Sequence, residues 1–122
     1  MSTNTGVEEE KNRLIEAIRD SETYRRFENA KELLKGEEVK KSIIDNFREK
    51  AYLLSNSSEP LDHMDDLEDL FVVRREIRKD PMIDEYLTAE HEYCRMIQRI
   101  CSELMALSDV QIEAFEDSIL VR

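Results

Sequence analysis

The longest uninterrupted helical pattern of the chain runs from Asp80 to Leu107, and it constrains the fold more than any other stretch. Asp80-Pro81 predicts its start, because the residue before a proline avoids the helical region and proline suits the first helical position. About 27 helical residues at about 1.5 Å each span roughly 40 Å, which is longer than the core of one small domain needs. We expect such a helix to pack on other helices, on a second copy of the chain, or on both.

A heptad pattern gives this helix an apolar seam. The predicted interaction surface consists of seven seam positions: Ile83, Leu87, Glu90, Cys94, Ile97, Cys101 and Leu104. Glu90 breaks the apolar pattern, and a buried carboxylate is costly unless it is paired or hydrogen-bonded. We expect an Arg, Lys or Tyr from a neighbouring helix to satisfy Glu90 and fix the register. The alternative is a specificity contact at an oligomer interface.

The rest of the chain also favours helices. Only two glycines and two prolines occur among 122 residues, a length that fits one domain. Helix-favouring Glu, Leu, Lys, Arg, Ile and Ala fill most positions. The sequence predicts an all-α antiparallel bundle of about five helices that dimerises, after a disordered segment at residues 1–6. A single helical domain is expected over residues 7–122, with helices at about 7–19, 22–35, 37–55, 62–79, 81–107 and 109–118.

Local signals place several helix ends. Lys35-Gly36 predicts a helix exit, because glycine takes the left-handed conformation after the last helical residue without a Cβ penalty. Residues 55–60 predict a loop that a proline closes. Residues 59–70 hold six acids and no Lys or Arg. We expect them to form the solvated start of a helix, where acids complement the dipole, and a cation or partner site is the alternative.

Charge and hydropathy exclude several functions. The formal net charge of −11 repels phosphate backbones, so we expect no direct nucleic-acid binding. No apolar run approaches the roughly 18 residues that a membrane span needs, so no membrane insertion is expected. The first residues are polar and then acidic, unlike a signal peptide, so the cytoplasm is the expected location. Cysteines there are expected to stay reduced.

His91, Cys94 and Cys101 are the candidates for metal or redox chemistry. A spacing of seven residues places the two thiols on one helix face about 10 Å apart, too far for a disulfide within one straight helix. His91 and Cys94 supply two ligands where a structural zinc site needs four, so a second subunit would have to complete it. Packing of small side chains is the preferred interpretation, and no cofactor is assigned. In an antiparallel dimer, Cys94 would face the partner's Cys101 and make the pair sensitive to oxidation.

No phosphate loop, nucleophile elbow or metal-binding helix motif occurs in the sequence. A lone seam carboxylate with no nucleophile beside it does not indicate catalysis. The chain is therefore expected to be a non-enzymatic interaction protein. The alternatives are an acidic helical inhibitor or structural module, or a metal-binding helical-bundle enzyme.

Four segments together carry a family resemblance. Ser21 to Tyr24 opens a helix as Ser-x-x-Tyr, and residues 30–34 hold an Ala-Lys and Leu run before a turn. Ile43 to Phe47 has the pattern Ile-Ile-x-x-Phe, and residues 86–90 have Tyr-Leu-x-Ala-Glu. With these segments the chain resembles the YlbF/YmcA family of bacterial helical proteins over most of residues 7–107.

The resemblance implies an all-helical, dimerising, non-enzymatic regulatory protein. Characterised relatives act as adaptors that assemble with related subunits, associate with the endoribonuclease RNase Y, and so influence mRNA processing, competence, sporulation and biofilm formation. The expected partners are therefore a second copy or related helical proteins, in an RNase Y-associated complex. Some of those assemblies carry iron–sulfur clusters, but this sequence shows no cysteine-rich tail, so no cluster is carried over to it.

Overall fold

The computed structural model describes residues 4–56 and 64–108 of the chain. Within these ranges it contains five helices and no strand: α1 (Thr5–Arg19), α2 (Glu22–Leu34), α3 (Glu38–Ser55), α4 (Met64–Ile77) and α5 (Pro81–Ala106). The predicted all-α class and the long helix from residue 81 are confirmed. Thr5 and Gly6 lie inside α1, two residues before its expected start. The helix expected at 109–118 and residues 1–3 lie outside the described part.

Asp80 caps the start of α5. Its carboxylate accepts hydrogen bonds from the backbone N–H groups of Met82 at 2.9 Å and Ile83 at 3.3 Å, which satisfies two donors that the first helical turn leaves free. Lys40 of α3 pairs with the other carboxylate oxygen at 2.9 Å. The hydrogen bond from Lys40 holds the pKa of Asp80 below its ordinary value. The cap therefore also connects α3 to α5.

Gly36 turns the chain between α2 and α3. Its φ of 83° lies in the left-handed region, which glycine enters without the steric cost that a Cβ brings. The predicted helix exit at Lys35-Gly36 is confirmed, because α2 ends at Leu34 and Lys35 follows as its cap.

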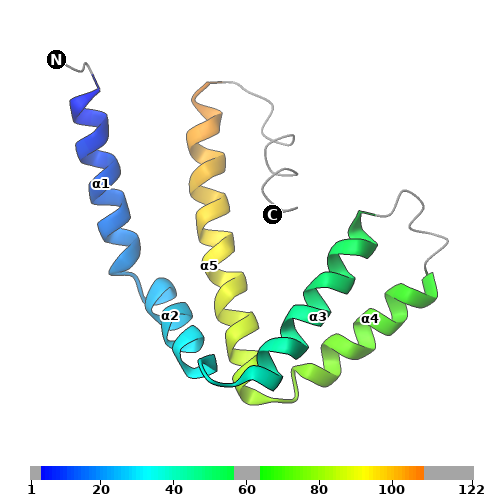
Figure 1. Cartoon of the computed structure of the whole chain (residues 1–122). Coiled ribbons are helices and arrows are strands. Elements are labelled where there is room, and N and C mark those ends of the chain that lie inside the picture. Colours follow the sequence, from blue (N-terminus) through cyan, green and yellow to red (C-terminus); the bar gives the residue numbers. More distant parts are fainter. Residues whose placement is uncertain (1–3, 57–63, 109–122) are drawn as a thin grey trace.

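Two antiparallel pairs of helices define the architecture (Figure 1). Helix α2 packs along the first half of α5, and α3 packs against α4. Helix α1 has its main contacts with α2 and stands beside the second half of α5, apart from it. The molecule is therefore open: α1, the second half of α5 and the α3–α4 hairpin diverge from a shared base.

The core lies at that base, where α2, α3 and α5 meet. Leu34, Ile44 and Ile83 form its centre, one from each helix, and each is almost fully buried. Ala30 and Ala89 are also buried, and their small side chains suit the close approach of α2 to α5. These five are the buried hydrophobic residues of the described part. A core this small leaves much apolar surface outside it.

Aromatic rings extend the α2–α5 contact away from the core. Phe27 stacks on Tyr93 with ring centroids 5.2 Å apart, and it also meets Tyr86 at 5.8 Å. Tyr24 approaches Tyr93 at 5.9 Å in a tilted arrangement. These distances lie in the range favoured by aromatic pairs. The stack holds α5 against α2 as far as Tyr93.

Candidate protein-interaction surfaces

The predicted seam residues of α5 fall into two groups, one on each side of Glu90. Ile83 is only 2% exposed and belongs to the core, and Leu87 is half-buried against that core. Beyond Glu90 the seam opens: Cys94 is exposed, Ile97 and Cys101 are half-buried, and Leu104 is 56% exposed. The first group is occupied by the chain's own helices. The second group retains apolar surface that a partner can cover.

Helix α1 carries the second open apolar surface, and the sequence pattern alone did not single it out. None of its residues is buried, although its apolar residues recur at helical spacing. The open faces are defined here as the exposed apolar residues of α1 and of the end of α5: Val7, Leu14, Ile15, Leu104 and Leu107. Large apolar patches on a monomer typically mark interaction sites.

Arg26 of α2 links α2 to α5 through ion pairs with two glutamates. Its guanidinium donates to both carboxylate oxygens of Glu85, at 2.8 and 2.7 Å, and to Glu92 at 2.9 Å. The hydrogen bond to Glu85 raises the pKa of Arg26 and correspondingly lowers the pKa of Glu85. A bidentate contact of this kind orients the guanidinium and the carboxylate relative to each other as well as attracting them. The seven-residue spacing of Glu85 and Glu92 indicates a shared face, but nothing in the sequence pattern identifies Arg26 as their partner.

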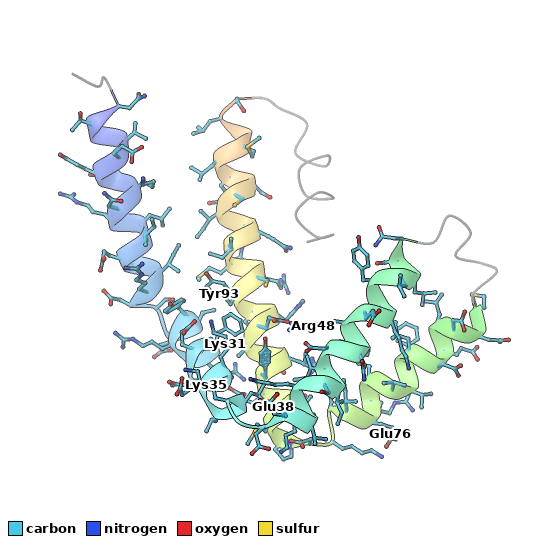
Figure 2. The ribbon with its side chains drawn as sticks, viewed as in Figure 1. Lys31, Lys35, Glu38, Arg48, Glu76 and Tyr93 are labelled. Atoms are coloured by element: carbon cyan, nitrogen blue, oxygen red, sulfur yellow. The ribbon has the colours of Figure 1, made fainter. Side chains whose placement is uncertain are left out.

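Glu90 is paired within the chain. Arg48 of α3 donates to the Glu90 carboxylate, and the Tyr86 hydroxyl donates to the same oxygen at 3.1 Å. Arg48 also lies over the Tyr86 ring, 5.4 Å from its centroid, and Figure 2 shows it between α3 and α5. Burial opposes the charge of Arg48, but the hydrogen bond to Tyr86 and the charge of Glu90 outweigh it and raise the pKa of Arg48. The expected cation for Glu90 is thus Arg48.

The Glu90–Arg48 pair is half open to water, and this sets the expected effect of Glu90→Leu. The Arg48 side chain is 42% exposed, so its charge can turn to solvent when Glu90 is replaced. We expect the free energy of unfolding in urea to change by about 1 kcal/mol or less, as for other solvent-screened pairs. Glu90→Gln is the matched control. A loss of more than about 3 kcal/mol would contradict this reading, because it is the size expected for a cation left buried without a partner.

The two thiols lie on the open half of α5, where Cys94 is exposed and Cys101 half-buried. Local desolvation of the Cys94 sulfur and the nearby charge of Glu90 raise the pKa of its thiol, which lowers the fraction of reactive thiolate. Across residues 4–56 and 64–108, no three His, Cys, Asp or Glu side chains are grouped so that they could hold a metal ion. No helix in this part of the chain combines the length and apolar character of a membrane span.

Comparison with known proteins places the chain in a family. The family model described as control of competence regulator ComK, YlbF/YmcA, matches residues 7–107. The match includes all five helices but for the first two residues of α1. Comparison with curated proteins and with solved structures gave no match. The chain therefore belongs to the YlbF/YmcA family, which is described by control of the competence regulator ComK.

Proposed function

We propose that this protein is a non-enzymatic, cytoplasmic regulatory adaptor that acts through helix–helix contacts, as a homodimer or as a hetero-oligomer with related helical proteins. The observation that carries the proposal is the pair of open faces on α1 and α5. Leu104 is 56% and Val7 66% exposed, on helices that the described residues of the chain leave partly uncovered. Family membership supports the regulatory role.

The energetics favour association through these faces. Full burial of one large aliphatic side chain contributes about 1.5–3 kcal/mol, so covering several of them offsets the entropy lost on association. The core formed by residues 4–56 and 64–108 is small, so a partner would add substantially to the apolar area that is buried. In a two-fold symmetric dimer, the open faces of both copies would be covered at once. A related helical protein would cover the open faces in the same way in a hetero-oligomer.

The regulatory output in this proposal is RNase Y-dependent mRNA processing, and through it competence, sporulation or biofilm formation. A family description that concerns control of a competence regulator supports this direction. The net charge of −11 disfavours direct contact with RNA. The protein would thus act on the nuclease or its assembly, and not on the transcript itself.

Affinity purification of the tagged full chain from its native bacterium tests the proposal. Three forms are compared: the wild type, the open-face variant Ile15→Glu with Leu104→Glu, and the control Leu33→Glu with Leu53→Glu, which alters two exposed leucines elsewhere. We expect the wild type and the control to recover related helical proteins and RNase Y, and the open-face variant to lose them. Recovery of the chain alone, or the same partners with the open-face variant, would contradict the proposal.

A further inference from the structure

The second half of α5 has a charged side and an uncharged side. In residues 94–107 the charged residues are Arg95, Arg99 and Glu103, and all three are exposed. Their spacing of four residues places them along one side of the helix. The opposite side carries the docking ridge, defined as three half-buried residues that also follow at intervals of four: Ile97, Cys101 and Met105. Such a ridge suits contact with the uncharged face of another helix.

The described residues leave the docking ridge partly open. The aromatic contacts of α2 reach α5 as far as Tyr93, and the ridge lies beyond them (Figure 1). Leu104, which lies next to the ridge, is 56% exposed. A helix that packs on the ridge would remove further apolar surface from water, which favours the contact.

Residues 109–118 follow α5 directly and lie outside the described residues. Their sequence predicts a helix, because Ser108 and Gln111 have the spacing of a capping box. In a helix, one side of this segment would carry its four acids: Asp109, Glu113, Glu116 and Asp117. The other side is uncharged and carries Ala114 and Phe115. The segment is thus predicted to have the kind of face that the docking ridge suits.

The connection between α5 and this segment is short. Helix α5 ends at Ala106 and the predicted helix begins at residue 109, so that Leu107 and Ser108 connect them. The Ser108 hydroxyl donates to the carbonyl of Met105 at 3.0 Å, which ties the connection to the end of α5. Helices joined by about two to five residues commonly pack as antiparallel neighbours. The segment is therefore expected to run back along α5.

The length of the segment matches the length of the docking ridge. A helix over residues 109–118 is about 15 Å long, at about 1.5 Å per residue. With residue 109 level with Ala106, Ala114 is level with Cys101, and residue 118 is level with Ile97. The predicted helix thus reaches from one end of the ridge to the other.

The tether favours the chain's own segment over a second copy as occupant of the docking ridge. A short connection keeps a segment near its site at an effective concentration of about millimolar. A second copy has to come from solution, and two chains of net charge −11 repel each other. A second copy would also have to displace the tethered segment.

We propose that residues 109–118 pack as a helix on the docking ridge of the same chain, and that they thereby compete with a partner for the neighbouring Leu104. The packing stands by itself, whereas the competition rests on the proposed function, in which Leu104 belongs to the open faces. The segment is then an autoinhibitory element, because the whole end of α5 becomes accessible only when the segment leaves the ridge. The apparent affinity for a partner is reduced by the fraction of molecules whose ridge is free.

Disulfide trapping in full-length protein tests the packing. The trapping variant combines Cys94→Ser with Ala114→Cys, so that Cys101 and the introduced thiol form the available pair. The first control, Cys94→Ser with Glu113→Cys, places the introduced thiol on the acidic side of the segment. The second control, Cys101→Ser with Ala114→Cys, leaves Cys94, which lies about 10 Å farther along α5. All three are oxidised with diamide in dilute solution, after circular dichroism has verified equal helical content of the reduced proteins.

We expect the trapping variant to form a disulfide within one chain at least about tenfold faster than either control, because a disulfide needs Cα atoms within about 7 Å. The product would migrate as a single chain on a non-reducing gel and would have no free thiol. A trapping variant that is oxidised no faster than its controls would overturn the packing. A product linked mainly between chains would also overturn it, because the ridge would then hold the segment of a second copy.

The trapped disulfide also tests the competition, because the same molecule is compared before and after reduction. Sedimentation velocity should show that the trapped form associates about tenfold more weakly than the reduced form. Phe115→Glu, which weakens the packing of the segment, should associate more strongly than the wild type. Added negative charge alone would weaken association between acidic chains, so a gain reports release of the ridge.

Equal association of the trapped and reduced forms, or no gain for Phe115→Glu, would overturn the competition. A failure to recover partners in the affinity purification described above would contradict the proposed function and the competition with it. The rate of disulfide formation would still decide the packing, because that rate is measured on single chains.

Discussion

Replacement of Ile83 by alanine is expected to lower the free energy of unfolding by about 3 kcal/mol, within the range for truncation of a buried aliphatic side chain. Ile83 is 2% exposed and joins the core residues of α2 and α3 to α5. The cavity would open where three helices meet, and the described part of the chain has few other buried side chains to compensate. Such a loss is a large share of the roughly 5–15 kcal/mol that stabilises an ordinary domain.

Urea unfolding followed by circular dichroism measures this effect. The protein concentration is held constant, because association adds to apparent stability. Val39→Ala is the matched control, since Val39 is also an aliphatic residue in a helix but is 74% exposed. Equal losses for Ile83→Ala and Val39→Ala would show that the base of the molecule is not its stabilising core.

The second large effect is expected at the open faces. The double variant Ile15→Glu and Leu104→Glu should weaken association about a hundredfold or more, because each partner contact would have to bury a carboxylate without a cation. The fold of the single chain should be unchanged, since both side chains are already exposed, by 39% and 56%. Sedimentation velocity over a range of concentrations measures the dissociation constant.

The control for this variant is Leu33→Glu with Leu53→Glu, which changes the charge by the same amount at residues that are 60% and 63% exposed. It separates loss of an apolar contact from simple repulsion between acidic chains. If the control weakens association as much as the open-face variant, net charge and not the faces would explain the effect. Unfolding of the open-face variant would contradict the exposure of these two residues in the single chain.

Local features of the fold follow from the sequence because their causes are local. Asp80-Pro81 predicts the start of α5, and the Asp80 carboxylate does cap its first turn. Lys35-Gly36 predicts the end of α2, and Gly36 does take the left-handed conformation. In both places a side chain, or the lack of one, acts on backbone groups within three residues.

The candidate surfaces depend on which helices meet, and periodicity does not contain that information. Ile83 and Leu104 occupy the same seam, yet one is 2% and the other 56% exposed, because α2 and α3 cover only the first half of α5. The need of Glu90 for a cation follows from the cost of burying a carboxylate. The sequence does not identify Arg48 as that cation, because Arg48 and Glu90 are 42 residues apart and meet only in the folded chain.

The mass of the native assembly tests the central claim most directly. Extract from the organism that makes the protein is sedimented, and the untagged chain is detected in the fractions for the wild type and for the variant Ile15→Glu with Leu104→Glu. Association through the open faces predicts a wild-type species of at least twice the 14.4 kDa chain mass, and a shift of the variant toward the single chain. A wild-type protein that sediments as a single 14.4 kDa chain would contradict the claim.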